Sequence, residues 1–480
     1  MSVREERAFG RTPLLPEERE YDTRGAHTTN FAYAIATWCF LIGGYIAQLV
    51  GAVQGLVCLV AGTMIGAFLT TMPLGLGCHR YGLEQMDCCT PSFGTRGIKI
   101  LLVFYLINML GWSGLILVMF GNGIQNIIEA IGFQTGDWIV GAGVALGFWL
   151  SYLMVTRGVH LLNIATSIIT PGLALLIAYM FYVLFRDYGW ERIAAAPPLD
   201  PGPDSLKNYL ICIELGIANG ISWFGGIGFL ARNTRRRRNA IYPELVQLGF
   251  MTGVVSSIGL FSALVIQSDD PTEWMIPLGG VYLGILALIF VALANITSTA
   301  VSLFASGLAI RHVHIFRDRK WRQLIVILIM PCVPFVFWPH QLADAGDAFL
   351  AFNGTMYGPV SGILFADFIF LRRQKYNLWS IFEDHPNGSY HYAWGFNWIA
   401  IGSLLLGQAL YIWLYNPGTG ETHPLFFYIN PSIAACVVPA VTYAIGMKLL
   451  GWHEKSIRVS EDQLRRNKLP PGQRLIDPNI

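Results

Sequence analysis

Apolar runs long enough to cross a lipid bilayer recur along most of the chain. A spanning helix needs roughly 20 mainly apolar residues, and short polar segments separate runs of about this length. We expect twelve transmembrane helices, near residues 30–54, 57–76, 98–127, 136–155, 162–187, 207–231, 242–268, 279–306, 321–339, 345–371, 393–415 and 424–450. The pattern predicts an all-α integral membrane protein, with polar tails at 1–29 and 451–480.

Basic residues concentrate in every second loop between these spans. The loops after the sixth, eighth and tenth spans are rich in arginine, as in the run at 235–238. The intervening loops carry acidic residues such as Asp137, Asp269 and Glu421. Because positively charged loops remain on the cytoplasmic side, we expect both tails in the cytoplasm and the chain in the plasma membrane.

The composition agrees with a membrane protein and narrows its chemistry. Hydrophobic residues make up 54% of the 480-residue chain and charged residues 13%. The net charge of +2 says little about a partner, and we expect no nucleic acid to be bound. The eight cysteines form no CxxC pair, and the adjacent Cys88 and Cys89 fall in a predicted cytoplasmic loop, where thiols stay reduced. We therefore expect neither a disulfide nor a zinc site.

Glycines interrupt two of the predicted spans. The sixth contains the stretch IANGISWFGG (217–226), and the first contains the pair Gly43 and Gly44. Transporters built from two inverted repeats use broken helices, whose free peptide groups bind substrate and ions at mid-membrane depth. We therefore favour breaks at both positions and two five-helix repeats followed by two further helices; the alternative is that these glycines only permit close packing. The corresponding units are residues 30–187, 207–371 and 393–450.

Polar and aromatic residues inside the spans are candidates for the binding site. Thr297 and Ser298 in the eighth span offer oxygen atoms suited to a small cation such as sodium, although membrane hydroxyls often bond their own helix. Trp112 lies in the middle of the third span, flanked by two glycines, where a planar ligand could stack on its ring. The alternative for Trp112 is a side chain facing lipid or the core.

Two acidic residues in the predicted spans, Glu214 and Asp367, are candidates for a functional or structural role. Glu214 is six residues before Gly220 in the sixth span, and a buried carboxyl at this depth is a functional candidate by default. It could carry a driving proton, accept hydrogen bonds from a substrate, or be a structural carboxyl. Asp367 lies near the cytoplasmic end of the tenth span, where pairing with Arg372 or Arg373, or capping of the helix end, is expected.

Several sequence blocks resemble one known family of membrane proteins. They are SFGTRG (92–97), GWSG (111–114), the Thr-Ser pair of the eighth span, GPVSGILFADFIFLRR (358–373) and WGFNW (394–398). With them the chain resembles the nucleobase–cation symporter-1 group of hydantoin, cytosine and purine–cytosine permeases. The resemblance implies a LeuT-type fold of twelve helices, with a 5+5 inverted repeat whose first and sixth helices unwind midway.

The resemblance also implies a substrate pocket. Trp112 matches the family's stacking tryptophan, and Asn219 and Gly220 fall at the break of the sixth helix, where the pocket is lined. Gly44 stands where the hydantoin permease has a glutamine facing substrate. The chain departs from that permease at two more positions, with Ile116 in place of a glutamine and Leu303 in place of an asparagine. These departures make the pocket less polar, and Glu214 is outside the family pattern.

A sodium site is implied by the same resemblance. Thr297 and Ser298 match the hydroxyl pair that binds sodium in the hydantoin permease, and Ala294 matches a carbonyl ligand on the same helix. Phe40 and Gly43 match carbonyl ligands of the first helix. Glu214 keeps proton coupling open as the alternative.

We therefore expect a monomeric secondary active symporter that imports a small planar nitrogen heterocycle, such as cytosine or a purine, by alternating access. The coupling ion would be sodium or a proton, with no other cofactor. The alternatives are a carrier of allantoin, hydantoin-like ureides or a vitamin, and a passive channel. We expect no enzyme, because histidines such as His312 and His314 lie in loops, where we expect them to be solvated.

Overall fold

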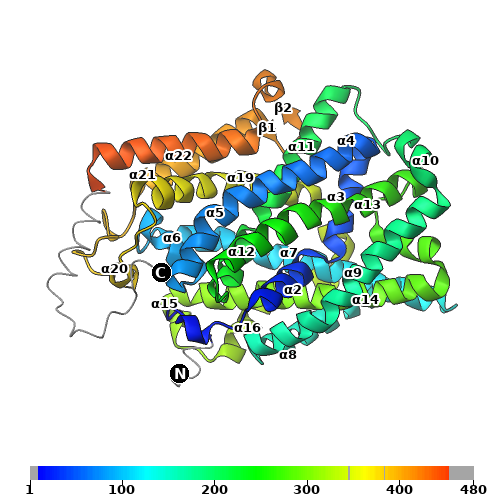
Figure 1. Cartoon of the computed structure of the whole chain (residues 1–480), viewed down its shortest axis with the longest axis horizontal. Helices are drawn as coiled ribbons and strands as arrows, with labels where there is room; N and C mark the ends of the chain where they lie inside the picture. The colour runs from blue at the N-terminus through cyan, green and yellow to red at the C-terminus, as the bar shows by residue number, and fades with distance from the viewer. Residues whose placement is uncertain (1–8, 344–345, 383, 453–480) are drawn as a thin grey trace.

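The structure, a computed structural model, describes residues 9–343, 346–382 and 384–452. The predicted C-terminal tail lies almost entirely outside these residues. The long helices lie side by side along the longest axis of the molecule (Figure 1). Among the described residues, nine helices are long and apolar enough to cross a membrane, and a bent pair makes a tenth. Two shorter apolar helices, Trp321–Cys332 and Trp398–Leu414, match the ninth and eleventh predicted spans.

The helices of the first half coincide with the predicted spans. The N-terminal η1 (Pro16–Glu18) is followed by α2 (Thr23–Ala34), α3 (Thr37–Leu49), α4 (Ala52–Val57), the π-helix η2 (Cys58–Gly62), α5 (Thr63–Tyr81), α6 (Gln85–Phe93), α7 (Ile98–Ala130), α8 (Trp138–Val155), α9 (Val159–Asp187) and α10 (Gly189–Ala195). The first predicted span corresponds to α2 and α3, and the second to the continuous run from α4 to α5.

The second half is also made of membrane-length helices and ends with a further pair of helices. It contains α11 (Ser205–Ser222), α12 (Phe224–Arg232), η3 (Arg237–Ala240), the π-helix η4 (Glu244–Met251), α13 (Thr252–Ile266), α14 (Pro271–Ala309), η5 (Ile310–His312), α15 (His314–Arg317), α16 (Trp321–Ile329), α17 (Pro334–Phe337), α18 (Pro339–Ala343), α19 (Gly346–Phe365), the π-helix η7 (Ala366–Leu371), α20 (Leu378–Phe382), α21 (Trp398–Leu414) and α22 (Pro431–Leu449). A small antiparallel hairpin of β1 (Tyr415–Asn416) and β2 (Glu421–Thr422) connects the last two helices. The described chain confirms the all-α class, while the total of twelve spans stays a prediction.

The first span is interrupted, but not where the glycines predicted. The break lies at Ile35 and Ala36, between α2 and α3, and the two helices meet at a bend of 48°. The predicted break at Gly43 and Gly44 is therefore wrong, since both residues lie inside α3. Without a side chain, Gly43 lets α3 pack closely on α13: a Cβ there would lie 2.1 Å from the carbonyl oxygen of Ser256. The packing alternative holds for this pair.

The sixth span is interrupted close to the predicted stretch. The helix α11 ends at Ser222 and α12 begins at Phe224, with Trp223 between them. The backbone N–H of Trp223 bonds to the carbonyl of Ile221 and not to the residue four positions back, so the helical ladder is disturbed here. The interruption lies three residues after Gly220 and forms no sharp bend, because α11 and α12 still qualify together as one span.

The segment before α2 lies across one end of the helix bundle, which we call the α6 end. Leu14 donates a backbone hydrogen bond to Gly82, at 3.0 Å, and Tyr21 donates one to Asn233, at 2.8 Å. Gly82 ends α5 in the left-handed conformation, and a Cβ there would clash with the backbone of Leu14. Burial, together with the charge of Arg232, lowers the pKa of Arg19 in this segment to about 10.

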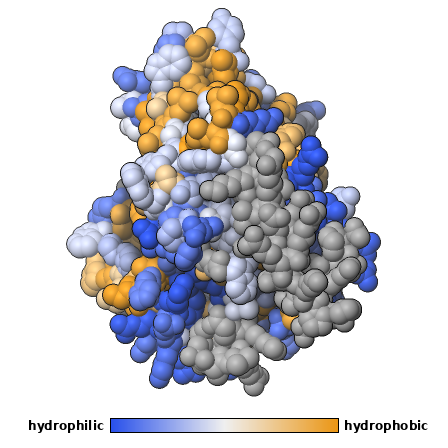
Figure 2. All heavy atoms as spheres, turned by 90° about the vertical axis from the view of Figure 1, so that its left-hand side faces the viewer, coloured by the Kyte–Doolittle hydropathy of each residue, from blue (hydrophilic) through white to orange (hydrophobic). Residues whose placement is uncertain are grey.

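The α6 end differs in polarity between its two parts. Figure 2 shows this end face-on, with hydrophilic residues over much of the lower half. Hydrophobic residues gather in the upper part, at the height where Figure 1 places α21 and α22. The basic residues at 235–238 follow α12 directly, and residues 235 to 238 are exposed.

Candidate functional site

A cavity lies beside the interruptions of the first and sixth spans. About 360 Å³ of space not filled by atoms, including its open part, is bounded by side chains from α2, α3, α7, α11 and α14 and by the linking residue Trp223. The lining residues are Tyr33, Trp38, Asn108, Met109, Trp112, Ile116, Ser222, Trp223, Ser298 and Ser302. A mainly apolar cavity with a few polar groups, formed between helices, is the usual form of a small-molecule site. Trp112, Ile116 and Ser298 were predicted site residues, and all three line it.

Aromatic rings dominate the wall of this cavity. The ring of Trp38 contacts Trp112 at a centroid distance of 6.1 Å and Trp223 at 4.8 Å, both edge to face. Tyr33 packs edge to face on Trp223 at 5.1 Å, and Phe349 of α19 packs in the same way on Trp112 at 5.4 Å. Such edge-to-face packing holds the rings in defined orientations, leaving flat surfaces suited to a planar ligand.

Three buried polar atoms of the lining residues have no hydrogen-bond partner among the residues that the structure describes. They are the indole nitrogens of Trp112 and Trp223 and the side-chain oxygen of Asn108. The amide nitrogen of Asn108 donates to the side-chain oxygen of Asn353, whose own nitrogen donates to the carbonyl of Phe349, so the free atom of Asn108 is its oxygen, an acceptor. Buried polar groups are nearly always satisfied in folded proteins. The cavity therefore has two donors and one further polar group available to a ligand.

The eighth predicted span, within α14, contacts the break of the first span. Asn295 accepts hydrogen bonds from both the backbone N–H and the hydroxyl of Thr37, at 3.0 and 2.9 Å, and so satisfies the first residue of α3. Ser298 donates to the carbonyl of Tyr33 at 3.2 Å, and Thr297 to the carbonyl of Ala294 at 2.9 Å. Hydroxyl and carbonyl oxygens of α14 and a carbonyl oxygen of the interrupted first span thus meet beside the cavity.

The sodium and substrate ligands predicted in the first span do not lie at this cavity. Phe40 and Gly43 lie inside α3, and the carbonyl of Phe40 faces Gly259 of α13, where an added Cβ would lie 2.0 Å away. Gly44 packs on the backbone of Asp269, where an added Cβ would lie 2.6 Å from the carbonyl oxygen. None of the three lines the cavity. The reason is the position of the break, which leaves them in a regular helix packed on its neighbours.

Asn219 and Gly220 lie near the cavity but face a neighbouring helix. The side-chain nitrogen of Asn219 donates to the hydroxyl of Thr63 on α5 at 3.1 Å. Gly220 packs on the same helix, where a Cβ would lie 2.2 Å from the carbonyl of Thr63. The carbonyl of Asn219 accepts a bond of 2.6 Å from Ser222, which does line the cavity. The structure thus places Ser222 and Trp223 where the sequence placed Asn219 and Gly220.

Glu214 and Leu303 also lie outside the cavity wall. The Glu214 carboxylate accepts bonds from the Tyr411 hydroxyl at 2.8 Å and from the hydroxyl and backbone N–H of Ser432 at 2.5 and 3.1 Å. Ser432 is the second residue of α22, so the carboxylate lies at the positive end of that helix. Glu214 therefore links α21 and α22 to the sixth span, and its predicted role in proton coupling stays a prediction. Leu303 is fully buried in the core beside Ser302.

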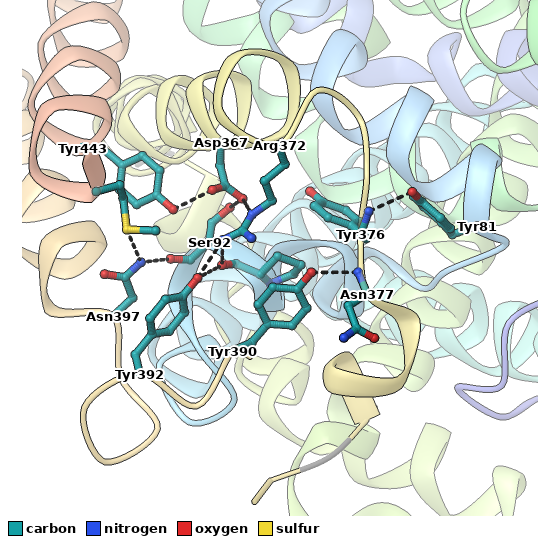
Figure 3. A network of polar contacts seen from close by, with 12 residues as sticks. Tyr81, Ser92, Asp367, Arg372, Tyr376, Asn377, Tyr390, Tyr392, Asn397 and Tyr443 are labelled. Atoms are coloured by element: carbon teal, nitrogen blue, oxygen red, sulfur yellow. Dashed lines mark hydrogen bonds and ion pairs between the residues drawn. The ribbon is translucent and has the colours of Figure 1, made fainter. Parts of the chain in front are cut away.

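The sequence blocks around Asp367 meet in one buried polar network at the α6 end (Figure 3). Asp367 accepts bonds from Arg372 at 2.7 Å, from Ser92 at 3.0 Å and from Tyr443 at 2.8 Å. Asn397 donates to the carbonyl of Ser92 at 2.7 Å and caps α21. The predicted pairing of Asp367 with Arg372 is confirmed. The network joins α6, η7, α21 and α22, and none of its residues lines the aromatic cavity. Three of the sequence blocks that carry the family resemblance therefore have a structural role here.

A second buried cluster at the α6 end corrects the expectation for His312. This histidine contacts Glu84 at 3.1 Å and Asp87 at 3.4 Å, and its side chain is only 4% exposed, so it is not solvated. The three side chains have a spacing that could hold a metal ion. Arg11, however, pairs with Asp87, and Arg232 interacts electrostatically with both carboxylates. The acidic pair thus has cationic partners within the protein.

Sequence reasoning missed Trp38, Trp223, Asn108 and Tyr33. Trp223 belongs to the stretch IANGISWFGG that predicted the interruption, and a tryptophan at mid-membrane depth was the signal used for Trp112. Asn108 is an amide inside the third span, where a polar residue is itself a functional signal. Trp38 and Tyr33 could not be identified, because their place in the site depends on where the first span bends.

Comparison with known proteins relates the chain to membrane permeases. Residues 13–455 match the family model described as permease for cytosine/purines, uracil, thiamine, allantoin. A purine-uracil permease of Arabidopsis thaliana is 22% identical over 429 residues, covering 82% of this chain and 69% of the relative. A hydantoin permease of Microbacterium maritypicum is 22% identical over 396 residues, covering 79% of each protein.

Solved structures show the same fold. A nucleobase-cation-symport-1 family transporter, in a closed conformation with bromovinylhydantoin bound, superposes with a TM-score of 0.76 at 18% identity, covering 94% of this chain and 98% of the other. A Na⁺-coupled sialic acid symporter, in a substrate-bound outward-open state, gives a TM-score of 0.57 at 14% identity, covering 90% and 91%. The chain has the LeuT-type transporter fold that its sequence blocks implied, and it belongs to the family of permeases for cytosine and purines, uracil, thiamine and allantoin.

Proposed function

We propose that the chain is a secondary active transporter that imports a small, flat nitrogen heterocycle such as a nucleobase by alternating access. Its family is one of multi-pass membrane permeases, which supports transport. The observation that carries the proposal is one aromatic cavity lined by Trp112 and Trp223, each with a buried indole N–H that has no partner among the described residues.

The chemistry of this wall suits the edge of a nucleobase. Indole N–H groups can only donate, so they complement a carbonyl oxygen or an unprotonated ring nitrogen. The Asn108 amide has one atom left for the opposite partner. The faces of Trp112 and Trp38 would hold the ring, with a contribution of roughly 0.5–1.5 kcal/mol from each aromatic pair beyond burial.

The charge of the wall narrows the class of cargo. The residues that line the described cavity include no acidic or basic side chain. A cationic ring such as that of thiamine would lose its hydration there without a compensating charge. We therefore place a neutral nucleobase ahead of a charged vitamin. Allantoin and hydantoin-like rings share the neutral amide edge and remain alternative cargoes.

We propose a sodium site formed by Thr297, Ser298 and the carbonyl of Ala294, together with carbonyl groups of residues 33–36. This set replaces Phe40 and Gly43 with the observed break, because Ser298 already contacts the carbonyl of Tyr33. Oxygen ligands of this kind suit a hard cation. An ion shared between α14 and the first span would favour the arrangement that closes the cavity, and substrate would tighten ion binding by the same factor.

The orientation and assembly of the protein are also proposals. We place the α6 end in the cytoplasm, because the basic loop at 235–238 lies there, and the chain in the plasma membrane as a monomer. The two halves, 30–187 and 207–371, would be inverted repeats. Both carry a π-helix in their second span, η2 in the first half and η4 in the second, which supports this division.

A ligand screen tests the proposed cargo. Purified protein is heated with cytosine, purines, uracil, allantoin, hydantoins or thiamine, each with sodium or with potassium at equal ionic strength. A neutral ring should raise the melting temperature, since a ligand that binds only the folded state stabilises it by mass action. Thiamine as the sole stabilising compound would contradict the neutral-ring proposal.

Uptake into vesicles that saturates and accumulates the ring against its gradient would distinguish a carrier from a channel.

Paired substitutions test the proposed ion. Thr297→Ala with Ser298→Ala should move the half-saturating sodium concentration upward by about tenfold or more, because two ligands are lost. Sodium dependence is measured as ring uptake into vesicles over a range of sodium concentrations. A sodium curve identical to that of the unchanged protein would contradict the sodium site.

A further inference from the structure

The seventh predicted span begins with an acidic residue that has no role in the site above. Glu244 is the first residue of the π-helix η4 and is fully buried, with 0% of its surface exposed. It faces α5, where Gly75 lies against its carboxyl: a Cβ on Gly75 would be 2.8 Å from the Glu244 Oε2 atom. Both helices are irregular here, since Pro73 interrupts the hydrogen-bond ladder of α5.

Neither carboxylate oxygen of Glu244 has a hydrogen-bond partner in the described structure. The hydroxyl of Thr71 on α5 is close enough to influence the carboxyl, but its oxygen is also without a hydrogen bond of normal geometry. The site thus contains a buried acid and a buried hydroxyl that face each other between two loosened helices. A native structure rarely leaves such groups unsatisfied without a reason.

The titratable side chains of the surrounding helices are occupied elsewhere. His27 of α2 bonds to Gln247, at 3.2 Å, and His79 of α5 bonds to Thr234, at 3.0 Å. Cys58 of η2 donates to the carbonyl of Tyr209, and α13 contains no titratable residue. The arginines of the neighbouring η3, Arg237 and Arg238, are exposed. None of these groups interacts with the Glu244 carboxyl.

Glu214 provides an internal comparison for this environment. Both glutamates are fully buried inside a span, but Glu214 accepts three hydrogen bonds, from Tyr411 and Ser432, which offset part of the cost of burying a charge there. An ionised carboxylate at Glu244 would have the Thr71 hydroxyl as its one nearby donor among the described residues, and burying an ion without a full set of partners costs several kcal/mol. The uncharged acid avoids that penalty, so this buried environment favours a protonated Glu244 over the carboxylate.

The π-helix itself does not require an acid at this position. The corresponding π-helix of the first half, η2, begins with Cys58, a small buried side chain. The acid is therefore specific to the second half of the chain. It also lies two residues after Tyr242, which is 63% exposed, so the carboxyl is close along the chain to the surface of the molecule.

We propose that Glu244 is a proton-binding site, which holds a proton in this conformation and releases it at the α6 end when α5 and η4 separate. The O–H bond of the carboxylic acid breaks, the proton passes to water, and the carboxylate is then hydrated. The proposal deepens the proposed transport function and rests on it for the direction of release. By linkage, a higher pH on the side of the α6 end favours the separated state.

Infrared spectroscopy tests the proton directly, without transport. A protonated carboxyl has a carbonyl stretch that an ionised carboxylate lacks, so this band should be present in the unchanged protein and lost in Glu244→Gln. Glu214→Gln is the matched control and should leave the band in place. A band that is lost in Glu214→Gln and kept in Glu244→Gln would overturn the proposal and place the proton on the other glutamate.

Transport in vesicles tests its consequence. Where proton release limits uptake, the rate in the unchanged protein should rise with pH on the side of the α6 end, by up to about tenfold per pH unit. Glu244→Gln should remove this dependence. The Gln variant is first shown to bind the cargo in the melting assay, which separates failure of this inference from failure of the proposed cargo. Should it fold poorly, the neutral Glu244→Met repeats the test, and retained pH dependence in either variant overturns the proposal.

Discussion

The aromatic residues of the cavity are those on which substrate binding depends. Trp112→Ala should abolish saturable uptake, because it removes both a stacking face and an indole donor, whereas Trp112→Phe should retain part of the stacking. Uptake of labelled ring into vesicles measures both. Trp149 of α8, which is 56% exposed, is a matched control, and Trp149→Ala should transport normally. Full uptake by Trp112→Ala would contradict the stacking role.

Asp367 is the residue on which the polar network of the α6 end depends. Asp367→Ala should lower stability by roughly 3–5 kcal/mol, because it leaves the buried Arg372 without its counter-charge. Thermal unfolding in detergent measures the loss. The exposed pair of Arg186 and Asp187 is the control, and Asp187→Ala should change the melting temperature little.

The double variant Asp367→Leu with Arg372→Met extends this prediction. It removes both charges together and should recover much of the lost stability, since apolar residues of similar volume can replace a buried ion pair. A double variant as unstable as Asp367→Ala would show that the other hydrogen bonds of the network, from Ser92 and Tyr443, matter more than the ion pair.

At the scale of helices, hydropathy was sufficient to locate the spans but not their interruptions. Each predicted span overlaps an apolar helix of the structure, because a continuous apolar run has only one stable form in lipid. Glycine is ambiguous, since it weakens a helix and also lets two helices approach. In α3 the glycines allow the close approach of a neighbouring helix. The break lies instead at Ile35 and Ala36, neither of which is a glycine or a proline.

The site was predictable to the extent that single residues signal it. Trp112 and Ser298 stand out within apolar runs and lie at the cavity. Phe40, Gly43 and Gly44 were predicted as site residues on the assumption that the first span breaks near them. Because the break lies earlier, at Ile35 and Ala36, none of the three lies at the cavity. Asn219 and Gly220 lie about one helical turn before Ser222 and Trp223, the residues of the sixth span that do line the cavity, because the interruption lies after Gly220.

The packing role of Gly43 can be tested against a glycine in open space. Gly43→Ala should destabilise the protein by about 1–3 kcal/mol, because the new methyl group would meet the backbone of α13. Gly402→Ala on α21 has no neighbouring atom within 4 Å and should be neutral or slightly stabilising. Thermal melting of the two variants provides the comparison. Equal melting temperatures would contradict the close approach of α3 and α13.

At the scale of the whole molecule, the buried cysteines make the orientation testable. All eight are buried, so membrane-impermeant maleimide should find little background reaction. Thr419→Cys lies in the exposed turn between β1 and β2, and Arg236→Cys lies in the exposed basic loop. In intact cells the first should be labelled and the second should be protected until the membrane is opened. The reverse pattern would invert the proposed topology.

The last two helices are tied to the bundle at two distant places. Near one end, Tyr411 and Ser432 bond to Glu214 of α11, and at the α6 end Tyr443 bonds to Asp367. A pair fixed at two points cannot swing or slide on its own. The distance between spectroscopic labels on α22 and α11 should therefore be the same with and without cargo. The distance between labels on α2 and α11 should report the conformational change of the transport cycle.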